Sequence, residues 1–427
     1  MGYTWCGVLM LLTAVTAEVA TSGYKLTVVC QKERQLVEAL DRYVTITLSN
    51  QSHVDETVQR FLRDVKEERS RIDVIAEWIG HPINAFHLVE RTVNGWREVQ
   101  QNINCITCVS TTATQEFHTA WKGIIEEDGI WSSSDDVITA AKGLGRLYAT
   151  YDLDIKKMIS GTILNTSTSP LTTPDVIKIA NYLEIKDQIK WYEAFLELLG
   201  DVTKNESILY KLAIAYHLGG MSSKALGILT ELQATSTRSM DTMIKNIRKK
   251  AEMIEEDIPQ KKIETVDDIH NSYQQLCQGN IQAVNVTPVL HCYNKVTRIP
   301  FYTVKEEVLS DVPRISRFHD VISDADISQL QDITKPNLTR AKVFTDGIAT
   351  AIDNRIGETA FVSNTMEICL KMEKRIELIT GLDTIFRKEV KTTEKFQVVN
   401  YGIGGHYSFH YDALDVSICF GTLHNSC

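Results

Sequence analysis

Apolar residues in the first quarter of the chain recur at helical spacing. Between positions 54 and 79 they step mostly by threes and fours, with one polar gap: Val54, Val58, Phe61, Val65, Ile72, Ile75 and Ile79. This stripe predicts long helices over residues 24–100, with a coiled-coil-like seam along one face. It fits either a helical hairpin that packs on itself or a self-association surface. Pro82, directly after His81, breaks the pattern and starts another helix.

The helical pattern continues to about residue 255, with one interruption. Residues 134–160 predict a single helix that Ser134 caps, with Asp135 and Asp136 in its first turn. The stretch "NTSTSPLTTPD" that follows is rich in Thr, Ser and Pro. We interpret it as the first domain boundary, because such clusters mark loops between periodic segments.

The stretch "ESILYKLAIAYHLGGMSSKALGILTEL" predicts a helix, a Gly-Gly turn and a second helix. Ala213, Ala215 and Ala225 are small residues at positions where the two helices would touch, as in a tetratricopeptide unit. Tyr210 and Tyr216 are candidates for binding substrate, because tyrosines on a concave helical surface stack on the prolines of an extended peptide. The same two tyrosines would serve equally well as half-buried packing residues.

The sequence pattern changes after about Tyr273, to short apolar runs separated by Gly, Pro and turn residues. These runs predict strands, with a helix that Ser323 and Asp324 cap and another near residues 366–381. The expected fold is therefore mainly α in the first two thirds, with a coiled-coil-like domain followed by a tetratricopeptide-like domain. An α+β region ends the chain.

Composition narrows the partners and the compartment. The 427 residues carry a net charge of −10 without a basic block, which argues against nucleic acid as the main partner. The apolar start, "MGYTWCGVLMLLTAVTAEVA", predicts a signal peptide over residues 1–17, although no Lys or Arg precedes it. Acceptor sequences for N-glycosylation, which fit the secretory pathway, lie at Asn50, Asn165, Asn205, Asn285 and Asn337.

Cysteines would tend to pair in an oxidising compartment. Cys277 and Cys292 flank a short loop and are the best candidates for a disulfide. Cys105 and Cys108 have the spacing of a redox motif, but their polar, Thr-rich surroundings favour a structural bond or two free thiols.

The closing stretch "NYGIGGHYSFHYDALDVSICFGTLHNSC" contains a His-x-Asp pair, His410 and Asp412, in a run that predicts a β-strand. Residues two apart on a strand face one side, so both could reach one metal ion. Imidazole plus carboxylate with open positions suits non-haem Fe(II). On a helix, His406 and His410 would instead suit zinc, but the glycines argue against a helix. The two could also be ordinary strand residues without a metal.

Several motifs in fixed order give a more specific signal: "GHPINAFHLVERTVNGW", "AAKGLGRLYATYDLD", "LAIAYHLGG", "PRISRFHDVISDADI", "ITGLD" and "QVVNYGIGGHYSFHYD". With these the chain resembles the α subunits of collagen prolyl 4-hydroxylases. The resemblance implies a dimerising domain over residues 18–165, a peptide-substrate domain over 170–255 and a dioxygenase domain, the start of a double-stranded β-helix, over 273–427.

The resemblance also implies a chemistry and partners. Such enzymes hydroxylate proline in procollagen with Fe(II), 2-oxoglutarate, O2 and ascorbate. They pair with protein disulfide isomerase in the lumen of the endoplasmic reticulum. By motif match, His410 and Asp412 would bind iron, Tyr401 would lie near the 2-oxoglutarate, and Cys277 and Cys292 would form an intrachain disulfide.

The chain departs from the family after Asp412. The family places a second iron-binding histidine and a 2-oxoglutarate-binding lysine further downstream, and "ALDVSICFGTLHNSC" supplies neither. His424 is too close to Asp412 to be that histidine. We therefore expect a chain truncated in its catalytic domain, and the sequence leaves open whether that chain is active. The alternative to a hydroxylase subunit is a non-catalytic, dimerising subunit that binds proline-rich peptide.

Overall fold

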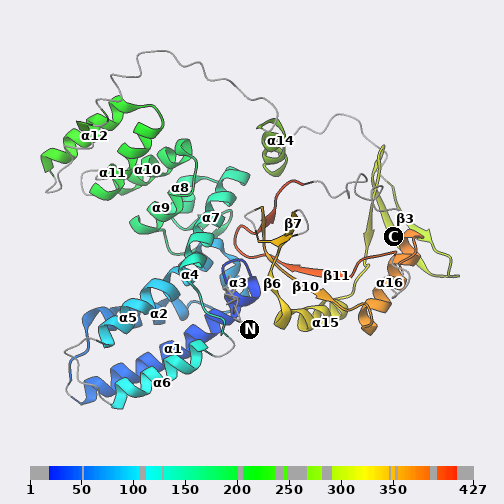
Figure 1. The fold of residues 1–427 in the computed structure, drawn as a ribbon, viewed down its shortest axis with the longest axis horizontal. Helices are drawn as coiled ribbons and strands as arrows, with labels where there is room; N and C mark the ends of the chain where they lie inside the picture. Colours follow the sequence, from blue (N-terminus) through cyan, green and yellow to red (C-terminus); the bar gives the residue numbers. More distant parts are fainter. Residues whose placement is uncertain are drawn as a thin grey trace, which may run out of the picture.

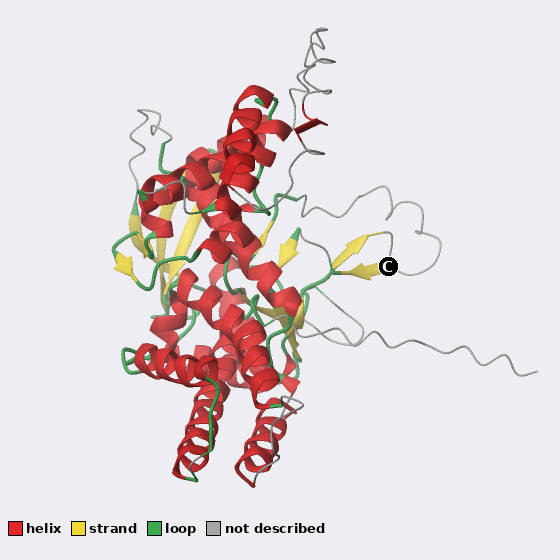
Figure 2. Cartoon of the chain, turned by 90° about the vertical axis from the view of Figure 1, so that its left-hand side faces the viewer, coloured by secondary structure: helices red, strands yellow, loops and turns green. Residues whose placement is uncertain are grey.

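The computed structural model is helical through its first two thirds and α+β at its end (Figure 1). It describes residues 19–50, 52–104, 112–126, 129–200, 205–235, 244–245, 247, 267–280, 291–345, 348–351, 354–384 and 392–410. Figure 2 shows the strands gathered at the flanks of a predominantly helical body. The expected fold class is confirmed.

The first helical part follows the predicted apolar stripe. Its elements are α1 (Gly23–Ser49), α2 (Glu56–Arg69), α3 (Ile75–Gly80), α4 (Pro82–Glu90), the π-helical turn η1 (Arg91–Gly95), α5 (Trp96–Ile103) and α6 (Thr112–Glu126). The stripe is divided between two helices, because α2 ends at Arg69 and α3 begins at Ile75. The predicted break at Pro82 is confirmed, since this residue opens α4.

A second set of helices completes the helical region. It comprises α7 (Ser134–Tyr151), α8 (Ile155–Ile159), α9 (Thr173–Ala180), α10 (Ile185–Leu199), α11 (Glu206–Leu218), α12 (Ser222–Thr235) and α14 (Asp267–Cys277). The single helix predicted over 134–160 is wrong: α7 ends at Tyr151, because the left-handed backbone of the next residue, Asp152, stops the helix, and α8 follows. Its cap is Ser133, not Ser134, because Ser133 exchanges capping-box bonds with Asp136.

The predicted linker, residues 165–175, supplies β2 (Thr166–Ser167), which forms a short hairpin with the preceding β1 (Thr162–Ile163), and its last residues begin α9. A single apolar cluster extends across it, since Val137 and Leu144 of α7 belong to the same cluster as Val176 and Ile179 of α9. A second cluster, around Trp96, joins α1, α2, α5 and α6. The domain boundaries expected from the sequence remain predictions.

The final region contains small antiparallel sheets and two helices. The elements are β3 (Cys292–Val296), β4 (Thr303–Asp311), β5 (Arg314–His319), α15 (Asp324–Thr334), the 3₁₀ turn η4 (Lys335–Asn337), β6 (Thr339–Arg340), β7 (Val343–Thr345), β8 (Ile348–Thr350), β9 (Arg355–Ile356), β10 (Glu358–Val362), α16 (Glu367–Thr380), β11 (Phe396–Asn400) and β12 (His406–Tyr407). The sheet that matters for the site has the order β11-β10-β6. The predicted helix near 366–381 is confirmed as α16.

Candidate functional site

The candidate site follows strand β11, where the chain leaves the three-stranded sheet. β11 pairs antiparallel with β10, and Asn400 lies opposite Glu358 at the end of the ladder. Residues 401–405, which we call the Gly-rich loop, then turn the chain into β12. His406 in β12 pairs with Ile356 of β9. Two short ladders therefore fix both ends of the Gly-rich loop.

His410 lies just beyond β12 and outside any strand. The strand predicted through this position is wrong among the described residues, because the ladder ends at Tyr407. The His410 ring folds back instead: it stacks on Tyr407 with ring centroids 3.7 Å apart, and its Nδ1 donates to the carbonyl oxygen of Ser408 at 2.7 Å. The segment is not helical either, so His406 and His410 do not share a helix face.

The hydrogen bond of His410 suits a metal ligand. Ligating histidines commonly donate one ring N–H to a carbonyl, which leaves the other nitrogen to bind the ion. Here Nδ1 makes that bond and Nε2 would be the ligand. Asp412 and His424 lie outside the described residues. Within the described part of the chain, no three His, Cys, Asp or Glu side chains are grouped so that they could hold a metal.

Tyr401 opens the Gly-rich loop and is 45% exposed. Its ring packs on two glycines: a Cβ on Gly357 would lie 2.8 Å from the ring, and one on Gly405 would lie 3.0 Å from it. Any larger residue at Gly357 would therefore displace the ring. Close packing against backbone fixes where the Tyr401 hydroxyl can reach.

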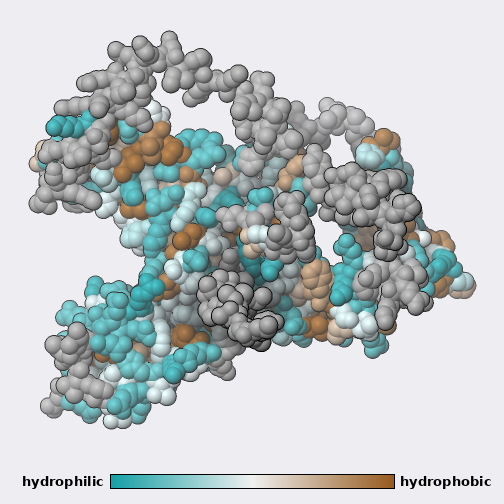
Figure 3. Space-filling model, viewed as in Figure 1, coloured by the Kyte–Doolittle hydropathy of each residue, from teal (hydrophilic) through white to brown (hydrophobic). Residues whose placement is uncertain are grey.

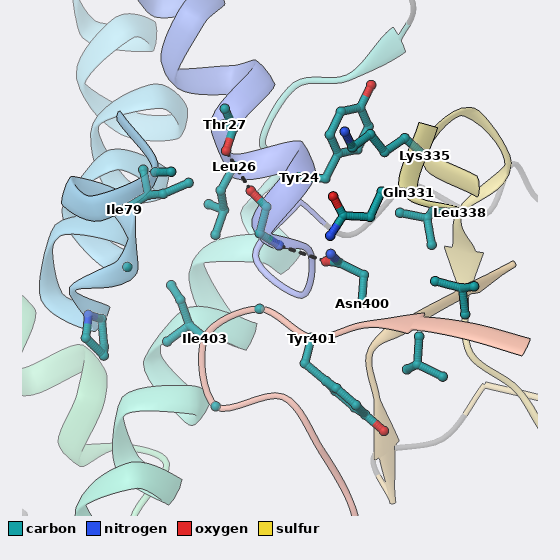
Figure 4. Close-up of a pocket in the computed structure, with 18 of the residues that line it drawn as sticks. Tyr24, Leu26, Thr27, Ile79, Gln331, Lys335, Leu338, Asn400, Tyr401 and Ile403 are labelled. Carbon is teal, nitrogen blue, oxygen red and sulfur yellow. Dashed lines mark hydrogen bonds between the residues drawn. The ribbon is translucent and has the colours of Figure 1, made fainter. Parts of the chain in front are cut away.

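A cavity of about 750 Å³ lies beside this loop, between the helical region and the α+β region. One wall is formed by α1, α3 and α7, and the other by α15, η4, β11 and the Gly-rich loop. Figure 4 shows Tyr24, Gln331 and Lys335 gathered at one side of it, with Asn400 below them. The volume falls within the range of small-molecule sites.

The two candidate substrate tyrosines differ in their surroundings. Tyr216 is only 7% exposed, its hydroxyl donates to Glu193, and Lys224 lies 5.1 Å from its ring centroid. Burial and the Glu193 carboxylate raise its pKa to about 12. Tyr210 is partly buried against the main apolar cluster. These contacts fit packing roles, and a substrate role for either residue stays a prediction.

Apolar surface is nevertheless exposed nearby. Figure 3 shows it over α10 to α12, where the exposed large apolar side chains include Leu198, Leu199, Leu218 and Met221. The predicted helix–turn–helix is confirmed as α11, a turn at Gly219 and Gly220, and α12. The fully buried Ala213, Ala215 and Ala225 allow the close packing that the sequence predicted.

The two cysteines of the expected disulfide are free thiols in this structure. Cys292 is exposed at the start of β3, and Cys277 ends α14, where its thiol interacts with Tyr273. The pairing of Cys277 with Cys292 therefore stays a prediction. Cys105 and Cys108 lie outside the described residues.

Sequence reasoning missed the residues that join the helical region to the site. Lys25 of α1 forms a buried ion pair with Glu358 of β10, and Gly23 N donates to Asn400 Oδ1 at 3.0 Å. These partners are 333 and 377 positions apart in the chain. No local spacing or periodicity could have indicated such pairs.

Comparison with known proteins finds relatives that are similar to this chain. A family model described as the prolyl 4-hydroxylase alpha-subunit, N-terminal region, matches residues 22–165. No described helix is long and apolar enough to cross a membrane. Prolyl 4-hydroxylase subunit alpha-1 of Rattus norvegicus is 29% identical over 419 residues, covering 84% of this chain and 75% of the relative.

Relatives from other animals give the same result. Prolyl 4-hydroxylase subunit alpha-1 of Caenorhabditis elegans is 27% identical over 446 residues, covering 95% of this chain and 75% of the relative. Prolyl 4-hydroxylase subunit alpha-2 of Gallus gallus is 27% identical, covering 94% of this chain and 78% of the relative. The similarity thus extends from the matched helical region into the α+β region, and the chain is similar to prolyl 4-hydroxylase α subunits over most of its length.

Proposed function

We propose that this chain is the α subunit of a prolyl 4-hydroxylase that acts on proline-rich, procollagen-like peptides. The reaction replaces a C4–H bond of proline with C4–OH while 2-oxoglutarate loses CO2 and becomes succinate. One oxygen atom of O2 enters the hydroxyproline and the other enters the succinate. The observation that supports the proposal best is His410, whose Nδ1 is held by a backbone carbonyl as in ligand histidines.

His410 and Asp412 would hold Fe(II), which supplies the O2-activating chemistry when bound, with ascorbate as the reductant that keeps it in the ferrous state. Tyr401 would orient the 2-oxoglutarate, because its ring is fixed against Gly357 and Gly405 while the residue stays 45% exposed. His410 would present Nε2 to the metal, because its bond to Ser408 O places a proton on Nδ1.

The helical region would bind the peptide and the partners. Tyr210 and Tyr216 are the proposed peptide-contacting residues on α11, and the first helices would mediate dimerisation. Protein disulfide isomerase would be the second subunit, in the lumen of the endoplasmic reticulum. In that compartment Cys277 and Cys292 would form a disulfide, which peptide mapping without reductant would detect.

Turnover of the assembled protein tests the proposal. The chain is co-expressed with protein disulfide isomerase and supplied with Fe(II), ascorbate, labelled 2-oxoglutarate and a Pro-Pro-Gly repeat peptide. We expect CO2 release coupled to hydroxyproline formation. Both should vanish in His410→Ala and persist in His319→Gln, which changes an exposed histidine of β5.

Two outcomes would contradict the proposal. Turnover that persists in His410→Ala would remove this residue from the site. Soluble, assembled protein that binds the repeat peptide without turnover would instead be a non-catalytic peptide-binding subunit.

A further inference from the structure

The first described residues of the chain are buried against the α+β region. Val19, Ala20, Thr21 and Ser22 are all 0% exposed. The backbone N–H of Ala20 donates to the buried carboxylate of Asp136 on α7 at 2.9 Å. Residues 19–25, which we call the docking segment, are therefore held in a fixed place on the helical body.

Backbone atoms of the docking segment meet the Gly-rich loop directly. Ile403 N donates to Ala20 O at 3.2 Å. The contact is so close that a Cβ on Gly402 would lie 2.4 Å from Ala20 O, a separation that real Cβ atoms do not adopt. Gly402 lacks a left-handed backbone, so this position requires glycine for space alone.

Helix α7 closes on the loop from the other side. A Cβ on Gly143 would lie 2.6 Å from Ile403 O, and Arg146 Nε donates to Gly404 O at 3.0 Å. Ile403 itself is 7% exposed and belongs to the main apolar cluster of the helical region. Among the described buried residues, it is the one member of that cluster that follows residue 247. The loop thus inserts a side chain into the helical core.

An ion pair and a hydrogen bond fix the adjoining strands. Lys25 Nζ pairs with Glu358 Oε1, and the two side chains are 8% and 1% exposed. Glu358 Oε2 has no hydrogen-bond partner among the described atoms, so Lys25 supplies the charge that balances this buried carboxylate. Beside it, Asn400 accepts from Gly23 N, as Figure 4 shows.

We propose that the docking segment and α7 position the Gly-rich loop, so that the helical region holds Tyr401 and the β12 segment leading to His410 in their binding geometry. Lys25, Gly402 and Asn400 are then positioning residues that act through the loop. The link to catalysis rests on the proposed function. The packing of the docking segment and α7 on the Gly-rich loop does not depend on that function.

Hydrogen exchange of the assembled protein tests the docking without any turnover. The probes are the amides of residues 396–410, among them Ile403 N. We expect Lys25→Met and Gly402→Ala each to raise exchange in this segment about tenfold or more, which corresponds to ~1.4 kcal/mol of lost protection. Lys25→Met with Glu358→Gln should recover part of the loss, because no unpaired charge stays buried.

Two matched controls should leave the segment unchanged. Lys66→Met breaks a half-exposed pair with Asp41 elsewhere on the helical region. Gly227→Ala adds a Cβ that meets nothing within 4 Å. Unchanged exchange in Lys25→Met and Gly402→Ala, with both folded, would overturn the docking.

Kinetics then test the positioning role. We expect the Gly402→Ala variant to raise KM for 2-oxoglutarate severalfold more than it lowers kcat, because Tyr401 adjoins the mutated residue. If Gly402→Ala speeds exchange but leaves KM for 2-oxoglutarate unchanged, the docking is only a structural contact. That result would overturn the proposal that the docking positions Tyr401. If the wild-type protein shows no turnover, the proposed function fails, while the exchange result still decides the docking.

Discussion

At the scale of single residues, the buried carboxylate of Glu33 stabilises the helical region. Glu33 is 0% exposed and accepts two hydrogen bonds from Arg91, at 2.8 and 2.9 Å, and one from Trp96 at 3.1 Å. We expect Glu33→Gln to lower the free energy of unfolding by about 3 kcal/mol, because Arg91 would stay buried with its charge poorly compensated. Chemical denaturation measures this. Glu38→Gln, whose pair with Arg34 is exposed, should cost about 0.5 kcal/mol.

The carboxylate of Glu33 also makes the stability of the protein depend on pH. Burial acts to raise the pKa of Glu33, but the charge and hydrogen bonds of Arg91, with Trp96 and Arg69, outweigh it and hold the pKa below its ordinary value. Its stabilisation is therefore present above the ordinary value and is lost as the pH falls through the folded value. The gap in unfolding free energy between wild type and Glu33→Gln should narrow in acid. A gap that widened in acid would contradict this assignment.

At the scale of elements, the carboxylate of Asp136 both completes the capping box at the start of α7 and binds the backbone of Ala20. Asp136 accepts from the N–H and the hydroxyl of Ser133, both at 2.8 Å, and also from Ala20 N. Asp136→Ala should cost roughly 2–4 kcal/mol, since the side-chain half of the capping box is lost and the buried N–H of Ala20 is left without its partner. Thermal unfolding checks it against Asp135→Ala, an exposed neighbour in the same turn. Equal effects of the two variants would show that the buried bonds contribute nothing.

Helices were more predictable than strands because their signals are local. The break at Pro82 and the turn between α11 and α12 follow from residues within a few positions of each other. The Ser133 cap was misplaced by one residue, since Ser132, Ser133 and Ser134 offer the same chemistry. The strand expected through His410 failed because the ring bonds back to Ser408, an alternative that alternation of apolar and polar residues does not exclude.

At the scale of the whole molecule, the junction between the regions could not be predicted. The motif around Tyr401 indicated a site, but its glycines looked like turn residues. In the structure, position 402 requires glycine for a different reason: a Cβ there would collide with the carbonyl oxygen of Ala20, near the other end of the chain. Contacts of this kind depend on how two regions dock, and no single stretch of sequence contains that information.

The proposed compartment makes a prediction for the whole chain, because passage through the endoplasmic reticulum exposes acceptor asparagines to glycosylation. Asn165 lies exposed in the turn between β1 and β2, whereas Asn205 caps α11 and donates through Nδ2 to Thr173. We expect Asn165 to carry a glycan and Asn205 to be unmodified. Mass spectrometry of protein from secretory-competent cells should show Asn165→Gln lighter by one glycan with an unchanged unfolding midpoint. Asn205→Gln should keep the glycan mass and unfold more easily. A wild-type chain that carries no glycan at Asn165 would contradict this prediction. A chain without a glycan at any site would mean that glycosylation does not support the proposed compartment.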